Sequence, residues 1–304
     1  MIGFIQNVVD ALSLGSLYAL AALGIGLLFG ILRLINLAHG DFITIGAFAL
    51  IVPSRNETAV MGIGSLPLLF MVLAVCAVVV ITALVSDRLV FSPLRRANAP
   101  TLMIASSSVS YVIQHSILVI FGARPKGIDL WSALGKSITI GPIHVPQIQL
   151  VTIGVTLLLM LALTAFLKRT PYGVQIRAAA EDFQMARYLG VKANIAIGVA
   201  FALSGILAAA VSLLYISQTG TLTSALGVPL MLYAFIATVV GGMGSLVGAV
   251  VGGFAVGFLA VMLQAYLPDD LRSFRDAFVF GVVILVLLVR PAGIVPTKAL
   301  AQRV

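Results

Sequence analysis

The stretch LRLINLAHGDF, from Leu32 to Phe42, places polar and charged side chains between two apolar runs that each resemble a membrane span. Its polar side chains are those of Arg33, Asn36, His39 and Asp41. A carboxylate near the centre of a bilayer costs about 2.5 to 3.5 kcal/mol on insertion scales. This stretch therefore lies either at a membrane surface or where water or protein surrounds it.

Two placements avoid that cost. The residues in question are Asn36, His39, Gly40 and Asp41. In the first placement they form a cytoplasmic turn, with Asn36 as the N-cap of the next span and Asp41 near its positive end. In the second they are a broken segment at the inner mouth of a translocation pathway. Both placements make the stretch the start of a helix, and Arg33 is expected to anchor the preceding span at the cytoplasmic surface.

The composition is that of a membrane protein. Of the 304 residues, 61% are hydrophobic and only 9% are charged, with a mean hydropathy of +1.17. A soluble domain is nearer a quarter charged, so we predict a polytopic integral membrane protein. The net charge of +8 comes from basic residues in short loops between apolar runs, which favours membrane orientation over nucleic-acid binding.

Nine apolar segments approach the length of about 20 residues that a span requires. They lie near residues 8 to 32, 37 to 53, 61 to 85, 100 to 122, 148 to 167, 195 to 217, 227 to 240, 243 to 267 and 276 to 290. Those at 37 to 53 and 227 to 240 are short and could be broken or re-entrant. We predict an all-α fold with about eight to ten transmembrane helices, forming one transmembrane domain over residues 1 to 304.

Basic residues indicate the orientation of these spans. Eleven follow the third span, follow the fifth span or close the chain: Arg88, Arg95, Arg96, Lys168, Arg169, Arg177, Arg187, Lys192, Arg290, Lys298 and Arg303. If these are cytoplasmic, nine spans place the N-terminus outside and the C-terminus inside. The loop from 123 to 147 then faces outward, where an external partner would dock, and its alternating SITIGPIHV segment could form a short hairpin or lie at the interface.

Several apparent motifs carry no chemistry. Gly135 to Ser137 resembles the end of a phosphate-binding loop, but Leu130 occupies the position that needs glycine. His39, His115 and His144 have no partners at metal-ligand spacing, so we predict no metal site. The serines lack a companion base, and in membrane helices serine more often marks a tight helix contact than an intramembrane enzyme.

The segment GGMGSLVGAVVGGFAVG, from Gly241 to Gly257, carries glycine at four-residue intervals. Gly244, Gly248 and Gly252 would share one helix face and let two backbones approach closely, so we predict helix packing there. The GGMG start could also break a helix, as around His39. Paired broken segments mark the pathway in many transporters.

The loop KRTPYGVQIRAAAEDFQMARYLGVKAN, from Lys168 to Asn194, predicts a helix of about five turns. Thr170 and Pro171 are typical of a helix start and Gly190 of a helix end. Small residues around one aromatic recur at helical spacing, namely Ala179, Phe183, Ala186 and Gly190. An interfacial helix would carry bulky apolar residues beside lysines, whereas this alanine face favours insertion into a protein cleft.

Four ordered motifs between Gly15 and Ile294 resemble the membrane permease of branched-chain amino acid ABC importers, the LivH type. They are GSLYALAALGIGLLFGILRLINLAHGDF at 15 to 42, RAAAEDFQMARYLGV at 177 to 191, GGMGSLVGAVVGG at 241 to 253 and VRPAGI at 289 to 294. The resemblance implies an ABC importer permease fold in the inner (cytoplasmic) membrane. It implies a second homologous permease subunit, two cytoplasmic ATPase subunits that use ATP and Mg, and an extracytoplasmic substrate-binding protein, with no cofactor bound by this chain.

The resemblance also implies roles for residues. The loop from 168 to 194 would hold the helix that couples ATPase closure to movement of the spans. The coupling residues would be Arg177, Glu181, Asp182, Phe183, Ala186 and Gly190. The candidate pathway residues are Asn36, His39, Gly40, Asp41, Gln114, His115 and Tyr233.

Three of these positions depart from the usual pattern of the family. Many members carry asparagine at the position of His115, lysine at that of Tyr233 and glutamate at that of Asp41. We predict a transport subunit, not an enzyme, that moves branched-chain or other small amino acids inward. A permease of the same family for urea or short amides is the alternative. A stand-alone secondary transporter or channel would usually place more ionisable residues in its spans.

Overall fold

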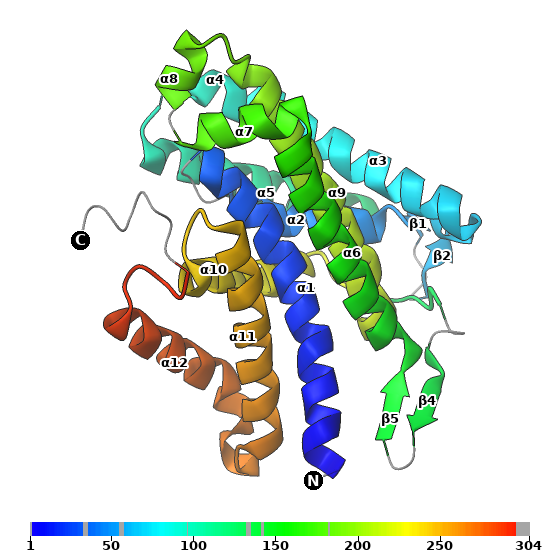
Figure 1. Ribbon diagram of the computed structural model, residues 1–304. Helices are drawn as coiled ribbons and strands as arrows, with labels where there is room; N and C mark the ends of the chain where they lie inside the picture. Colours follow the sequence, from blue (N-terminus) through cyan, green and yellow to red (C-terminus); the bar gives the residue numbers. More distant parts are fainter. Residues whose placement is uncertain are drawn as a thin grey trace. The chain divides into compact units, whose positions relative to one another are not determined.

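The computed structural model describes residues 2–32, 36–54, 58–95, 97–131, 135–140, 143–181 and 183–295. Within these ranges, a helix lies at each of the nine predicted spans (Figure 1). They are α1 (Ile2–Leu32), α2 (His39–Phe48), α3 (Leu68–Ser86), α5 (Ala99–Phe121), α6 (Gln147–Arg169), α9 (Ala193–Thr219), α10 (Gly227–Gly241), α11 (Leu246–Tyr266) and α12 (Arg275–Val289). The all-α prediction is confirmed.

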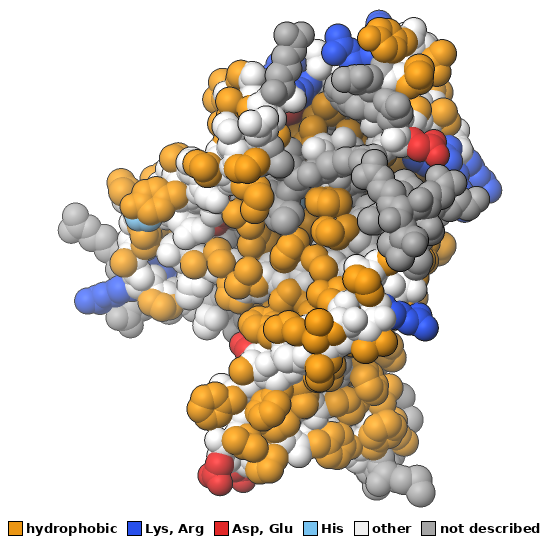
Figure 2. Space-filling view, turned by 90° about the vertical axis from the view of Figure 1, so that its left-hand side faces the viewer, with side chains coloured by type: hydrophobic (Ala, Val, Ile, Leu, Met, Phe, Trp, Pro, Cys, Tyr) orange, Lys and Arg blue, Asp and Glu red, His pale blue; other side chains and the backbone are white. Residues whose placement is uncertain are grey.

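Six of these helical segments are long and apolar enough to cross a membrane, in the part of the chain that the structure describes. They cover 3–32, 68–94, 100–121, 147–169, 194–219 and 246–266. The chain is therefore a multi-pass membrane protein. Hydrophobic side chains spread over much of the face that Figure 2 presents, as expected for a protein that contacts lipid.

The other three helices are short. α2 has 10 residues, while α10 and α12 have 15 each. At 1.5 Å per residue, α2 extends about 15 Å, half of a hydrocarbon core of about 30 Å. The prediction of short segments at 37–53 and 227–240 is confirmed, and α12 has the length of the segment predicted near 276 to 290, after the separate 3₁₀ helix at 269–274.

Smaller elements connect the helices. They are the 3₁₀ helices η1 (Ile63–Ser65) and η4 (Asp269–Phe274), the π-helical turn η2 (Asp87–Phe91), the helices α4 (Ser92–Leu94), α7 (Pro171–Glu181) and α8 (Phe183–Tyr188), and the strands β1 (Ile51–Val52), β2 (Val60–Met61), β3 (Lys126–Gly127), β4 (Ser137–Ile140), β5 (Ile143–Pro146) and β6 (Thr221–Leu222). The strands pair antiparallel as β1–β2, β3–β6 and β4–β5. The β4–β5 hairpin, with Ser137 opposite Pro146, is one of the two forms expected for the SITIGPIHV segment.

The chain divides into two compact units. Unit 1 comprises residues 1–26, 131–160 and 232–304, and unit 2 comprises residues 27–130 and 161–231. In unit 2, α2 packs against α3, α5 and α9, and nine of its ten residues are buried. Small residues allow this close packing, because a Cβ on Gly46 would lie 2.8 Å from the Ser212 Oγ and one on Gly205 would lie 3.1 Å from the Val80 Cα.

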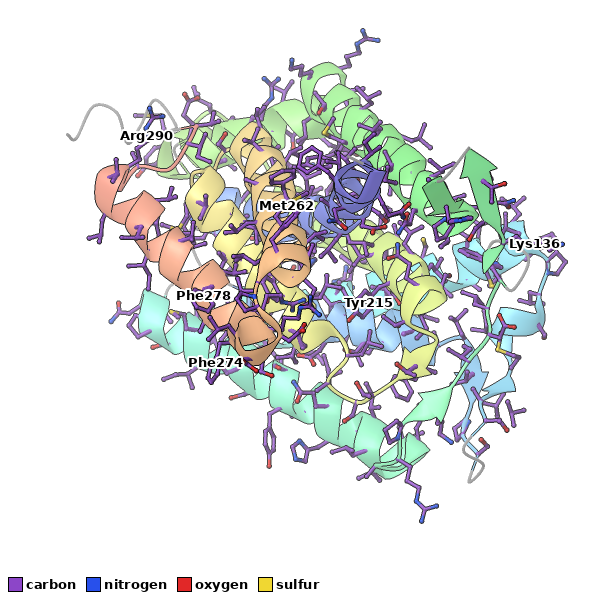
Figure 3. The ribbon with its side chains drawn as sticks, turned by 90° about the horizontal axis from the view of Figure 1, so that it is seen from below. Lys136, Tyr215, Met262, Phe274, Phe278 and Arg290 are labelled. Carbon is purple, nitrogen blue, oxygen red and sulfur yellow. The ribbon has the colours of Figure 1, made fainter. Side chains whose placement is uncertain are left out.

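In unit 1, glycines on two faces of α11 allow close packing against two helices, α10 and α1. Gly248 and Gly252 face α10, where an added Cβ would overlap the carbonyl oxygens of Gly241 and Ala237. Gly253 and Gly257 face α1, where an added Cβ would overlap the backbones of Ala19 and Gly15. α12 packs beside α11 and runs from Phe278 near one end to Arg290 at the other (Figure 3).

Gly244 does not belong to this packing face. It lies with a φ of +85° in the turn between α10 and α11, since α11 begins only at Leu246. The Ser245 hydroxyl accepts a 3.0 Å hydrogen bond from the Gly248 amide and so caps the new helix. The prediction that placed Gly244 on one helix face with Gly248 and Gly252 is therefore wrong, and the GGMG segment is a helix break.

Candidate functional site

The polar stretch enters α2 through a turn that Asn36 stabilises. The Asn36 Oδ1 accepts a 3.1 Å hydrogen bond from the Ala38 amide, which is an Asx turn. The helix begins at His39, and its N-cap residue is Ala38, which has no capping side chain. The prediction of Asn36 as the N-cap is therefore wrong, because its side chain bonds the Ala38 amide, which precedes the helix, and not an amide of the first helical turn. Arg33 lies outside the described residues.

His39 is fully buried against α9. Its Nδ1 lies 3.1 Å from the Ser204 Oγ, and its ring meets Phe42 edge-on at 6.4 Å between centroids. The Nε2 has no hydrogen-bond partner among the described residues. A buried imidazole with one free nitrogen can still donate to or accept from a group that approaches it.

Asp41 is also fully buried and faces α5. Ser110 and Gln114 lie close enough to interact with its carboxylate, yet within the described part of the chain neither carboxylate oxygen has a hydrogen bond of ordinary geometry. Gln114 instead donates from Nε2 to the Ser110 Oγ at 3.0 Å. The structure thus brings together two predicted pathway residues, Asp41 and Gln114, that are far apart in sequence.

The N-terminal turns of α2 and α10 meet inside unit 2. A Cβ on Gly40 would lie 2.7 Å from the Gly227 carbonyl oxygen. The Thr44 hydroxyl accepts a 3.0 Å hydrogen bond from the Gly227 amide and donates at 3.2 Å to the Gly40 carbonyl. Two short helices therefore direct their positive ends into one buried polar region, which also contains Asp41. This region is not an exposed turn, since Asn36, His39 and Asp41 are at most 1% exposed.

Of the remaining pathway candidates, His115 belongs to unit 2 and Tyr233 to unit 1. His115 is exposed, and its ring stacks on Tyr111 at 3.7 Å between centroids. Tyr233 belongs to unit 1, where it stacks on Tyr18 at 4.9 Å and donates a 2.5 Å hydrogen bond to Asp276. Within unit 2, His115 is therefore not part of the buried cluster around Asp41.

In the loop from 168 to 194, helical residues cover 171–181 (α7) and 183–188 (α8), within the range expected for the five-turn helix. Its ends are as predicted. The Thr170 Oγ1 accepts a 3.0 Å hydrogen bond from the Gly173 amide. Gly190, with a φ of +85°, donates to the Arg187 carbonyl while Val191 donates to that of Ala186, which is a Schellman motif. Asp182, between α7 and α8 in the sequence, lies outside the described residues.

The small-residue face of this loop is used within the chain itself. Gly173, Ile176 and Ala179 are buried, α7 packs against α9, and Ala186 is 3% exposed. The small side chains allow that close approach, so Ala179 and Ala186 of the predicted face are packed within the chain, while the insertion of this loop into a partner's cleft stays a prediction. The outward face is bulky instead, with Tyr188 84% and Leu189 81% exposed. Arg177, Glu181 and Gly190 are also exposed, while nothing is described of the Phe183 side chain.

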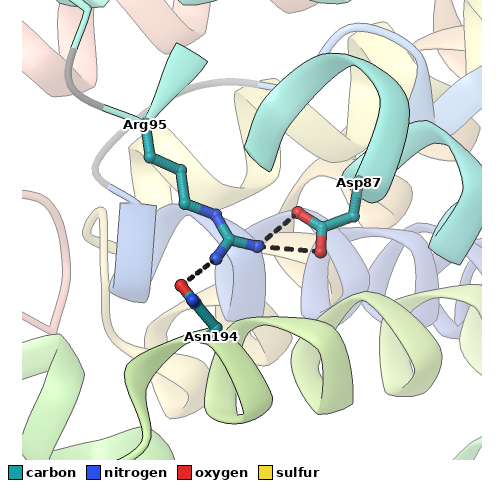
Figure 4. A network of polar contacts seen from close by, with 3 residues as sticks. All are labelled: Asp87, Arg95 and Asn194. Atoms are coloured by element: carbon teal, nitrogen blue, oxygen red, sulfur yellow. Dashed lines mark hydrogen bonds and ion pairs between the residues drawn. The ribbon is translucent and has the colours of Figure 1, made fainter. Parts of the chain in front are cut away.

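A polar network beside this loop was not anticipated from the sequence. Arg95 donates from Nη2 to both carboxylate oxygens of Asp87, at 2.8 and 2.9 Å, and from Nη1 to Asn194 (Figure 4). Asp87 is buried and opens the π-helical turn η2, while Asn194 lies in the first turn of α9. The network ties the segment after α3 to the residues that follow α8. No sequence period links these three positions, so the sequence alone distinguishes only the basic charge of Arg95.

The spans, the short helices that meet within unit 2 and the helical loop together define a multi-pass helical membrane protein. The chain belongs to the family described as branched-chain amino acid transport system / permease component, which matches residues 7–288. The family resemblance inferred from the four motifs is confirmed.

Individual relatives match over almost the whole chain. The chain is 32% identical to the high-affinity branched-chain amino acid transport system permease protein BraD of Pseudomonas aeruginosa, with 96% of this chain and 95% of that protein covered. It is also 32% identical to the corresponding protein LivH of Escherichia coli, with the same coverage. Among solved structures, PsaBC from Streptococcus pneumoniae in complex with Fab is similar with a TM-score of 0.46 and 15% identity, covering 93% of this chain and 90% of that one.

Proposed function

We propose that this chain is the permease subunit of an ATP-driven importer that moves branched-chain or other small, largely apolar amino acids inward across the cytoplasmic membrane. The observation that carries the proposal is the similarity to BraD and LivH over 96% of the chain. The buried meeting point of α2 and α10 supports it, because discontinuous helices with inward-pointing N-termini are a common way to build a substrate route through a membrane.

The proposed assembly contains a second homologous permease, two cytoplasmic ATPase subunits and an extracytoplasmic binding protein. ATP and Mg would be held by the ATPase subunits. The N-terminus would lie outside and the C-terminus inside. The β4–β5 hairpin would then face the outside, where the binding protein docks.

The exposed face of α7 and α8 is the proposed contact with an ATPase subunit. Met185, Tyr188 and Leu189 are 56%, 84% and 81% exposed there, with the charges of Arg177 and Glu181 nearby on α7. Tyrosine is enriched among the few residues that dominate binding energy, and methionine and arginine are enriched in interfaces generally. Since α7 packs against α9, a push on this face would reach a membrane-spanning helix directly. Asp182 and Phe183 belong to the same proposed coupling segment by sequence.

Co-purification and uptake test the proposal. The chain is co-expressed with its ATPase and permease partners and reconstituted with the binding protein, and uptake of labelled leucine is measured with and without ATP. Replacing both Tyr188 and Leu189 with alanine should reduce ATPase recovery and uptake by roughly tenfold or more. The matched control is Leu271→Ala, which truncates an exposed leucine of η4.

Other outcomes would point to other proteins. An ion gradient that drives uptake without ATP would support the stand-alone transporter. Uptake of urea or acetamide in preference to leucine would support the amide alternative. A native complex without ATPase would contradict the proposal.

A further inference from the structure

The seam between α2 and α5, within unit 2, has one polar end and one apolar end. On α2, Asp41, Ile45 and Phe48 are spaced by four and three residues and so share a face. That face meets α5, because Asp41 interacts with Ser110 and Gln114 there. The two ends of the seam are therefore separated by about one helical turn of α2, or about 6 Å.

The apolar end holds a crevice of about 310 Å³. Its lining includes Ile45 and Phe48 of α2, Val78 of α3, and Ile113, Ile117 and Phe121 of α5. The volume lies at the lower limit of the roughly 300 to 1,000 Å³ of small-molecule sites. An aliphatic group is the chemistry that this lining accepts, because it offers almost no polar partner.

The polar end presents the buried carboxylate of Asp41. Asp41 is fully buried, and among the described residues its carboxylate oxygens have neither an ion pair nor a regular hydrogen bond. The positive end of α2 and the donors on Ser110 and Gln114 stabilise the Asp41 carboxylate, but they carry no full positive charge. A buried carboxylate is usually paired with a cation or bonded to several donors, so Asp41, as the described residues surround it, is able to accept a cationic group.

We propose that this seam is a binding site for an aliphatic amino acid in transit, with its α-ammonium group on Asp41 and its side chain in the crevice. The inference rests on the proposed function and adds to it a site in the permease itself. One molecule satisfies both ends, since a branched aliphatic side chain spans about one helical turn from its ammonium group. A lipid acyl chain could fill the crevice, but it would leave Asp41 without a cation.

Binding to the permease without its binding protein tests this site. The complete permease–ATPase complex in nanodiscs is titrated with tritiated leucine, and two analogues compete: isoamylamine, which lacks the carboxylate, and isocaproate, which lacks the ammonium group. We expect isoamylamine to compete and isocaproate not to compete. Asp41→Asn should weaken leucine binding roughly 10- to 100-fold, as expected for losing a hydrogen-bonded charge pair.

Matched variants separate this effect from misfolding. Asp41→Glu keeps the charge and should bind leucine within a few-fold of wild type, and Asp270→Asn removes an exposed carboxylate of η4 and should change nothing. Ile117→Trp should fill the crevice and weaken binding of leucine more than that of alanine. Each variant is compared with wild type by size-exclusion profile and melting temperature.

Three results would overturn the site: no leucine binding at millimolar concentration, equal competition by isocaproate, or an Asp41→Asn variant that binds like Asp270→Asn. If Asp41→Asn binds leucine like Asp270→Asn and lipid is found in the crevice, the crevice is a lipid site. If ATP-driven leucine uptake persists in any of these cases, the site fails while the proposed function stands. If ATPase association and ATP-driven uptake are both absent, the proposed function fails.

Discussion

Gly40 and Gly227 touch through their backbones, where the first turns of α2 and α10 meet in unit 2. A Cβ on Gly40 would lie 2.7 Å from the Gly227 carbonyl oxygen, and a Cβ on Gly227 would overlap the Gly40 carbonyl oxygen. The 186 residues between them in sequence hold most of the chain, so the contact is a product of the fold. Neither position leaves room for a side chain.

Gly227→Ala should therefore force the two short helices apart. We expect a loss of about 1 to 3 kcal/mol in the free energy of unfolding, as for overpacking of a core. Thermal unfolding of the purified protein, monitored by the reaction of the Cys76 thiol with a fluorescent label, measures this loss. The control is Gly198→Ala in α9, where an added Cβ meets nothing within 4 Å. Equal melting temperatures for the two variants would contradict the close contact.

Thr44→Val should destabilise the same junction without changing its volume. The Thr44 hydroxyl bonds the Gly227 amide at 3.0 Å, and a buried amide that loses its acceptor costs about 1 to 3 kcal/mol. Thr82→Val is the matched control, because the Thr82 hydroxyl bonds only the Val78 carbonyl of its own helix, at 2.9 Å. Chemical denaturation in detergent compares the two. A larger loss in Thr82→Val would argue against the Thr44 bridge.

Arg95→Met should leave the buried Asp87 carboxylate without its cation. Removing one partner of a buried ion pair costs about 3 to 5 kcal/mol, and we expect the lower limit because the Arg95 side chain is 14% exposed. The exposed Arg88 provides the control variant Arg88→Met. In a double-mutant cycle, the variant that combines Asp87→Asn with Arg95→Met should lose less free energy of unfolding than the sum of the two single variants. Additive losses in that cycle would show that the pair is not coupled.

Two substitutions in α8 and its end should separate folding from coupling. Ala186→Leu adds volume at a buried position and should lower the melting temperature, by a free energy of about 1 to 3 kcal/mol. Leu189→Lys changes a side chain that is 81% exposed, so it should leave the melting temperature unchanged. Under the proposed function it should nevertheless reduce ATPase recovery in co-purification. If Ala186→Leu is silent in stability, the small-residue face is not packed as described.

The positions of the helices were predictable from sequence because hydropathy acts locally. Runs of apolar residues produced helices at all nine expected segments, and the segments at 37–53 and 227–240 gave the short helices α2 and α10. The ends of the 168–194 loop were predictable for the same reason, since Thr170 and Gly190 act on amides and carbonyls within one turn. The alternating SITIGPIHV segment likewise gave the local β4–β5 hairpin.

Other features could not be predicted, because distant residues determine them. Glycine spacing suggested one packing face, but the turn at Gly244 left Gly248 and Gly252 facing α10 while Gly253 and Gly257 face α1. The alanine face of α7 and α8 is compatible with a partner or with the chain's own α9, and only packing decides between them. The Asp87–Arg95–Asn194 network joins positions with no common period.

By itself, the sequence determined that this is a multi-pass helical permease of the branched-chain amino acid family, since composition, apolar length and ordered motifs are properties of the chain alone. Only the tertiary structure decided which polar residues meet. It placed Asp41 beside Gln114, put Gly40 against Gly227, and left His115 at the surface. The physical reason is that burial and pairing of a polar side chain depend on which helices surround it, and each of those helices comes from another part of the chain.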